Sequence, residues 1–154
     1  MINLAIVGCG KHASNFHVPS LRRLKKIYKI IGLFDANLSQ AKTLSKKNKI
    51  KKIYKSYRAM LADKNVDGIN ICSPAKFHSK QIIEAIKADK NVMVEKPMVL
   101  KSADLKEIIK INLKKKKKIL CLQKKNFKNK NKKLLNFFKI KKKKIGKIKF
   151  INGK

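Results

Sequence analysis

The chain has 154 residues, which suits one domain or one domain with the beginning of a second. Lysine and arginine together number 42 against 8 acidic residues, so the formal net charge is +34. Hydrophobic residues make up 44% of the chain, which excludes a wholly disordered protein, and no apolar run reaches the roughly 18 residues of a transmembrane helix.

Apolar runs and amphipathic stretches alternate along the first 110 residues. Residues 2–7 predict a buried strand, and the next stretch predicts a helix around Leu21 and Leu24 with Pro19 in its first turn. Further strands are predicted at 30–34, 53–54, 66–72, 92–94 and 119–122, and helices at 38–44, 57–61, 82–86 and from Ser102 as N-cap through 109. The pattern predicts an α/β fold with a doubly wound parallel sheet.

Charge divides the chain into two parts. All eight acids lie before residue 110, whereas residues 111–154 hold 19 lysines and no acid. We therefore predict a folded domain over 1–125, then a Lys-rich connector and the stub of a second domain over 126–154, with a strand at 145–151. Lys, Ile and Asn, whose codons are A/T-rich, make up 72 of the 154 residues, so biased coding explains much of the charge.

The basic tail leaves a second function open. Lysines without acids attract polyanions, so we expect nonspecific polyanion binding at low salt. Phe127, Phe137 and Phe138 could stack on bases, although the tail has no arginine and no recognisable nucleic-acid motif. A basic nucleic-acid-associated protein is therefore an alternative function.

A glycine-rich turn follows the first predicted strand. Its residues, Gly8 and Gly10 followed by Lys11, His12 and Ala13, have the spacing G-x-G-x-x-A. The first glycine allows a tight turn, the second lets a pyrophosphate approach the backbone, and the small third residue keeps helix and strand close. The motif also fits a glycine turn without a ligand.

Asp35 ends the second predicted strand, 22 residues after Ala13. A carboxylate there can accept hydrogen bonds from both hydroxyls of an adenosine ribose, and it repels a 2′-phosphate. The sequence therefore predicts NAD as cofactor in preference to NADP. The alternative is that Asp35 caps the helix that begins near residue 38.

Two further polar clusters follow predicted strands. Ser73 and Pro74, with His78 nearby, follow one strand, and Glu95 and Lys96 follow the next. Ligands of doubly wound sheets bind outside the carboxyl ends of the strands, which places these residues at the expected site. The alternatives are a loop with a locally packed histidine and a surface ion pair between Glu95 and Lys96.

No metal site is predicted, because His12, His17 and His78 lack the spacing of metal ligands. The cysteines at 9, 72 and 121 form no CxxC pair and lie in glycine-turn or apolar contexts, so we expect buried, unreactive thiols. A chain without a disulfide framework or a basic segment before its apolar start fits the reducing cytosol.

The order and spacing of these motifs resemble the Gfo/Idh/MocA family, whose namesakes include glucose-fructose oxidoreductase and inositol dehydrogenase. The resemblance rests on GCGKHA, on Asp35, on VDGINICSPAKFHSKQIIEAI and above all on NVMVEKPM, and it covers about residues 2–125. It implies that residues 1–125 form a dinucleotide-binding Rossmann domain. It also implies an oxidoreductase that passes hydride between nicotinamide and a secondary alcohol of a sugar, sugar nucleotide or cyclitol. The IGKIKFI segment resembles the entry to the family's second domain, which carries the substrate site and subunit contacts, so a homo-oligomer is possible.

The resemblance also assigns roles by position. It implies that Gly8, Gly10 and Ala13 hold the pyrophosphate and that Asp35 holds the ribose. It implies that Ser73 and Pro74 line the nicotinamide side, that His78 closes their loop, and that Glu95 meets the nicotinamide ribose. Lys96 would contact the substrate hydroxyl and help position the nicotinamide.

The family's catalytic Asp and His, which lie in the second domain, have no counterpart in these 154 residues. Removing the hydroxyl proton requires a base, and Lys96 is the only candidate, provided that burial lowers its pKa. We therefore expect a truncated chain that binds NAD with little or no turnover.

Overall fold

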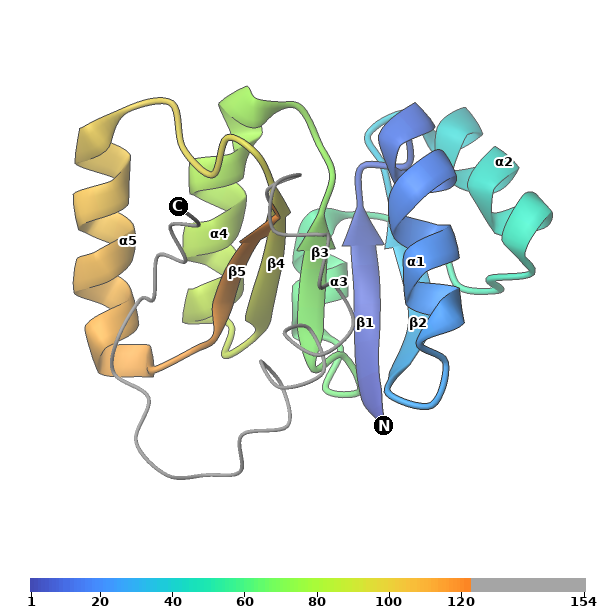
Figure 1. The fold of residues 1–154 in the computed structure, drawn as a ribbon, viewed down its shortest axis with the longest axis horizontal. Coiled ribbons are helices and arrows are strands. Elements are labelled where there is room, and N and C mark those ends of the chain that lie inside the picture. The colour runs from blue at the N-terminus through green and yellow to red at the C-terminus, as the bar shows by residue number, and fades with distance from the viewer. Residues whose placement is uncertain (123–154) are drawn as a thin grey trace.

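The computed structural model describes residues 1–122, and the predicted boundary at 125 and strand at 145–151 lie outside them. Five parallel strands form one sheet in the order β2-β1-β3-β4-β5 (Figure 1). The strands are β1 (Ile2–Val7), β2 (Tyr28–Phe34), β3 (Gly68–Ile71), β4 (Asn91–Glu95) and β5 (Ile119–Leu122). Residues 53–54, predicted as a strand, form only a parallel bridge from Ile53 to Leu33.

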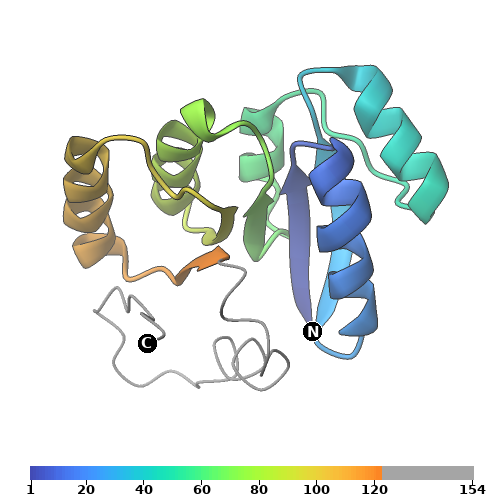
Figure 2. The same cartoon turned by 45° about the horizontal axis from the view of Figure 1, so that its top comes forward.

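Helices connect the strands on both sides of the sheet (Figure 2). They are η1 (Ala13–His17), α1 (Val18–Arg23), α2 (Leu38–Asn48), α3 (Tyr57–Ala62), η2 (Ala75–Phe77), α4 (His78–Lys87) and α5 (Ser102–Lys115). Ser102 is the first residue of α5, and the N-cap position is taken by Lys101, so the predicted N-cap is wrong by one residue.

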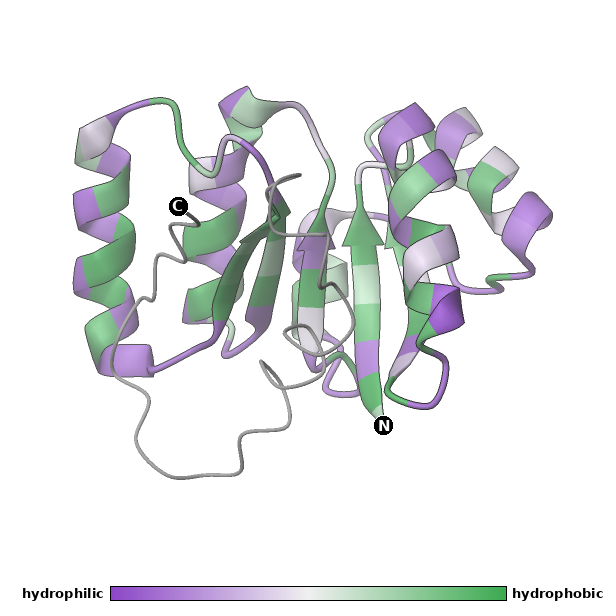
Figure 3. Ribbon diagram, viewed as in Figure 1, coloured by the Kyte–Doolittle hydropathy of each residue, from purple (hydrophilic) through white to green (hydrophobic). Residues whose placement is uncertain are grey.

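The side chains of β1 alternate between two cores. Ala5 and Val7 pack in the core shared with α3, α4 and α5, whereas Leu4 and Ile6 pack in the core shared with η1, α1 and α2. A strand buried on both faces must be apolar at consecutive positions, and β1 is hydrophobic along most of its length (Figure 3). This arrangement confirms the predicted doubly wound Rossmann sheet.

The sheet order places a topological switch point at β1. β2 pairs with one edge of β1 and β3 with the other, so the direction in which strands are added reverses at this point. In doubly wound sheets, ligands bind outside the carboxyl ends of the strands at such a reversal. The segments that follow β1, β2, β3 and β4 all begin at this end of the sheet.

Asp63 joins the end of α3 to the segment that follows α2. Its Oδ2 atom lies 2.6 Å from Nζ of Lys52 and accepts a hydrogen bond from the hydroxyl of Tyr54 at 2.8 Å, while Oδ1 accepts one from the backbone N–H of Asn65 at 2.9 Å. Hydrogen bonds from Lys52, Tyr54 and Asn65 hold the pKa of the Asp63 carboxyl well below its ordinary value.

A depressed folded-state pKa stabilises the protein above the unfolded-state value, and this stability is lost as pH falls toward the folded-state value. We therefore expect Asp63→Asn to lower the urea midpoint at neutral pH, and its difference from the parent to shrink below the ordinary carboxyl value of 3.8. The matched control is Asp89→Asn, which removes a carboxylate that is 61% exposed and that pairs, within residues 1–122, with the partly exposed Lys115 and Lys117, so a much smaller change is expected. A difference for Asp63→Asn that persists undiminished in acid would contradict this assignment.

Candidate functional site

Gly8 is the first residue after β1, and its conformation is open only to glycine without strain. Its φ is +86°, and its N–H donates to the carbonyl of Phe34 at 2.9 Å. A Cβ at this position would lie 2.5 Å from the backbone nitrogen of Ser73 and 2.6 Å from the carbonyl carbon of Cys72. The turn after β1 therefore packs directly against the backbone that follows β3.

Gly10 faces open space instead. A Cβ here would meet only the Oε1 atom of Gln40, at an ordinary contact distance of 3.5 Å. A helical run begins at Lys11, which is exposed together with His12, and the first N–H groups of a helix have no partner within it. Ala13 is fully buried and lets this helix lie close to the sheet. The turn thus offers backbone donors beside free space, which fits a pyrophosphate.

Asp35 follows β2 and holds the glycine turn. Its Oδ2 accepts a hydrogen bond from the N–H of Cys9 at 2.6 Å, and its Oδ1 accepts one from the N–H of Asn37 at 2.8 Å. The cap of α2 is Asn37, whose side chain accepts from the N–H of Ser39, so the alternative that Asp35 caps this helix is wrong. Asp35 is half-buried, and each carboxylate oxygen has a further lone pair for a ribose hydroxyl.

His78 joins the loops that follow β3 and β4. It is buried, its Nε2 lies 2.7 Å from the carbonyl oxygen of Ser73, and its Nδ1 lies 2.8 Å from that of Pro97. The Ser73 hydroxyl donates to the Oε1 atom of Gln81, and Pro74 is exposed beside it. His78 therefore links the two loops through hydrogen bonds to their backbone carbonyls. Ser73 and Pro74 lie at the carboxyl end of β3.

Glu95, the last residue of β4, binds two histidines. Its Oε1 lies 3.1 Å from Nε2 of His12 and 2.8 Å from Nε2 of His17, and its Oε2 accepts the N–H of Lys96 at 3.1 Å. The alternative of a surface ion pair between Glu95 and Lys96 is therefore wrong. Burial raises the pKa of Glu95, but the hydrogen bond and charge of His17, with the N–H of Lys96, outweigh it and lower the pKa overall.

Two predicted roles depend on burial. The Lys96 side chain belongs to an exposed residue, so the described part of the chain does not provide the burial that a lysine base requires. Cys9 is buried, and burial together with the charge of Asp35 raises the pKa of its thiol to about 12. Burial raises the pKa of the Cys72 thiol well above its ordinary value and also raises the pKa of the Cys121 thiol. Thiols with raised pKa are poor nucleophiles, but of the three cysteines predicted to be buried, only Cys9 is fully so, and Cys72 and Cys121 are partly buried.

The sequence pattern predicts no role for His17, which the structure places against Glu95, or for Asn70, which contacts His17. Nδ1 of His17 lies 3.2 Å from Oδ1 and 3.0 Å from Nδ2 of the buried Asn70 side chain. Burial lowers the pKa of His17 despite the opposing effect of Glu95. The signal in the sequence was the five-residue interval from His12 to His17, which is informative only if the local helix is known.

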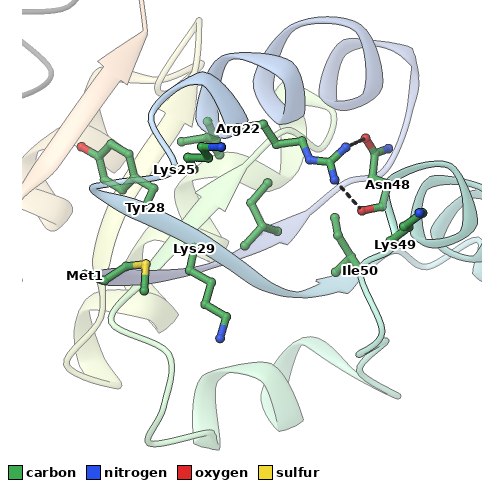
Figure 4. Close-up of a pocket in the computed structure, with 10 residues that line it drawn as sticks. Met1, Arg22, Lys25, Tyr28, Lys29, Asn48, Lys49 and Ile50 are labelled. Atoms are coloured by element: carbon green, nitrogen blue, oxygen red, sulfur yellow. Dashed lines mark hydrogen bonds between the residues drawn. The ribbon is translucent and has the colours of Figure 1, made fainter.

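A cavity of about 230 Å³ lies elsewhere, between α1, the beginning of β2 and the end of α2 (Figure 4). The Arg22 guanidinium crosses it to donate to the backbone carbonyl of Asn48 at 3.2 Å and to its side-chain oxygen at 3.4 Å. Met1 and Tyr28 line the same cavity, so it lies at the amino-terminal end of the sheet, away from the predicted dinucleotide-binding residues. No helix among residues 1–122 is long and apolar enough to cross a membrane.

The family model described as "Oxidoreductase family, NAD-binding Rossmann fold" matches residues 2–123. Myo-inositol 2-dehydrogenase of Thermotoga maritima is 27% identical over 108 residues, which cover 70% of this chain and 32% of the relative. D-glucoside 3-dehydrogenase of Escherichia coli is 29% identical over 107 residues, which cover 70% of this chain and 30% of that protein. The chain thus spans about a third of the length of these curated relatives.

Among solved structures, the WlbA dehydrogenase of Chromobacterium violaceum in complex with NADH and UDP-GlcNAcA has a TM-score of 0.76 and 30% identity. The match covers 87% of this chain and 38% of that one. The family model, the parallel sheet and the glycine turn held by Asp35 agree with one another. The chain therefore belongs to the Gfo/Idh/MocA family of oxidoreductases through an NAD-binding Rossmann domain.

Proposed function

We propose that this chain is the cofactor-binding part of a dehydrogenase that transfers hydride between nicotinamide and a secondary alcohol of a sugar, sugar nucleotide or cyclitol. The observation that carries the proposal is the Asp35 carboxylate, which holds the glycine turn through Cys9 at the point where the strand order reverses. The names of relatives that act on myo-inositol and on D-glucosides support the substrate class.

Different residues at the carboxyl end of the sheet would bind different parts of the cofactor. Gly8, Gly10, Lys11, His12 and Ala13 would hold the pyrophosphate through the helix start and the open face of Gly10. Asp35 would accept the two hydroxyls of the adenosine ribose. Ser73 and Pro74 would line the nicotinamide side, with His78 positioning their loop, and Glu95 would bind the nicotinamide ribose.

The nicotinamide ring supplies the hydride acceptor or donor when the cofactor is bound. Lys96, which follows Glu95 at the exposed end of β4, would contact the substrate hydroxyl and orient it. Proton removal from that hydroxyl requires a base, and a lysine takes this role only when its surroundings are dry. We therefore propose cofactor binding with little or no turnover by these 154 residues alone.

A calorimetric titration of the chain with NAD and with NADP tests the proposal. We expect saturable one-to-one binding of NAD, with NADP at least about tenfold weaker because its 2′-phosphate meets the Asp35 carboxylate at a cost of about 1.4 kcal/mol or more. Moderate salt suppresses the nonspecific attraction of a chain with net charge +34 for any anion. A folded chain that binds neither nucleotide, or that binds NADP as well as NAD, would contradict the proposal.

A further inference from the structure

His12, His17 and Glu95 bring three metal-ligating atoms together. One nitrogen from each histidine and one carboxylate oxygen all lie within 4.8 Å of one another. Both histidines direct Nε2 at the same oxygen of Glu95, at 3.1 Å and 2.8 Å. Two imidazoles and one carboxylate form the donor set of many zinc centres and of other transition-metal sites with open positions.

Two of the three ligands are already held in place. The Asn70 side chain contacts Nδ1 of His17 and fixes the ring so that Nε2 points at Glu95. The N–H of Lys96 binds the second oxygen of Glu95 and fixes the carboxylate. Outer hydrogen bonds of this kind orient the ligands of known metal sites and raise their affinity.

The third ligand leaves the site accessible. The His12 side chain is 47% exposed, whereas those of His17 and Glu95 are 4% and 17% exposed, so the cluster is most open to solvent at His12. The ring of Phe16 lies beside His12, with centroids 5.0 Å apart. An ion can therefore enter from the His12 side and keep water at its remaining positions.

We propose that His12, His17 and Glu95 form a binding site for a divalent transition-metal ion of the zinc type in the chain without nucleotide. The ion would bind Nε2 of each histidine and the carboxylate of Glu95. Each histidine would bind the ion as a neutral imidazole through Nε2, with its remaining proton on Nδ1. A histidine protonated on both nitrogens must first release one proton to solvent, so affinity falls at low pH.

Cobalt(II) is the probe for the test, because its visible absorption reports coordination and zinc can then displace it. The full chain without an affinity tag is titrated with cobalt, and NAD is omitted because Glu95 and His12 also belong to the proposed cofactor site. We expect a one-to-one endpoint, loss of the signal when zinc is added, and at least tenfold weaker binding in His12→Ala and Glu95→Gln. These two variants are preferred because His17 is buried and its replacement can unfold the chain.

The matched control is Asn15→Ala, which changes an exposed polar residue of the same helical turn and should leave cobalt affinity unchanged. Three outcomes would overturn the site. They are no saturable absorption in the folded parent, unchanged affinity in both ligand variants, and an intense near-ultraviolet charge-transfer band, which would assign the ion to the cysteines.

Discussion

Alanine in place of Asp35 is expected to weaken NAD binding at least 100-fold, or by about 2.7 kcal/mol. The variant loses the charged acceptor for two ribose hydroxyls, and hydrogen bonds to charged groups contribute about 1.5 to 3 kcal/mol each. It also frees the N–H of Cys9, which the carboxylate holds at 2.6 Å, so the glycine turn is no longer fixed for the pyrophosphate. Calorimetric titration with NAD at moderate salt measures the loss.

The control for Asp35→Ala is Asp67→Ala, which makes the same change in net charge. Asp67 also accepts a backbone N–H, that of Asn3 at 2.7 Å, but it precedes β3 and therefore lies at the opposite end of the sheet. We expect it to retain NAD affinity. Parent-like affinity in folded Asp35→Ala would exclude Asp35 as the ribose ligand, and an equal loss in both variants would indicate a general effect on folding.

Alanine at Gly8 is expected to destabilise the domain by at least about 3 kcal/mol, because two costs combine. An L-residue at φ +86° is strained, and its Cβ would overlap backbone atoms of Cys72 and Ser73 that cannot move aside as a side chain could. Since whole domains are stable by only about 5 to 15 kcal/mol, this is a large part of the total. Urea unfolding measures the change.

Gly10→Ala is the matched variant with the opposite outcome. Its Cβ would make only an ordinary contact with Gln40, and its φ is not positive, so we expect a change in stability below about 1 kcal/mol. The same methyl group would occupy the space where a pyrophosphate approaches the backbone, so NAD affinity should fall at least tenfold. A stable Gly8→Ala, or a Gly10→Ala that binds NAD as the parent does, would contradict the division of roles between the two glycines.

The fold was predictable because its signals are local. The strands are buried on both faces, so consecutive apolar residues such as those of β1 mark them directly, and glycine or proline follows several of them. Residues that follow parallel strands must meet at one edge, which is why Gly8, Asp35, Ser73 and Glu95 could be placed together without coordinates.

The contacts among Glu95, His12 and His17 were not predictable, because they depend on a local helix geometry that the sequence pattern does not indicate. In an α-helix, residues five apart point about 140° away from each other, so His12 and His17 would not meet. Here Val18 donates its N–H to the carbonyl of Ala13, five residues earlier, and this wider turn brings the two rings to 5.5 Å. The predicted alternative of an ion pair between Glu95 and Lys96 is wrong for the same reason. The wider turn brings His12 and His17 against the Glu95 carboxylate, and these two side chains are its partners.

The hydrogen bond between Asp35 and Cys9 also determines whether the glycine turn loses its conformational entropy during folding or during nucleotide binding. A flexible glycine loop would lose its conformational freedom as the nucleotide arrives, and that loss would reduce the affinity. In this chain the restraint comes from within the protein, through the hydrogen bond that the Asp35 carboxylate accepts from Cys9. The ordering is completed during folding, so the nucleotide meets a preorganised receptor and its affinity is not reduced by arranging the backbone around it.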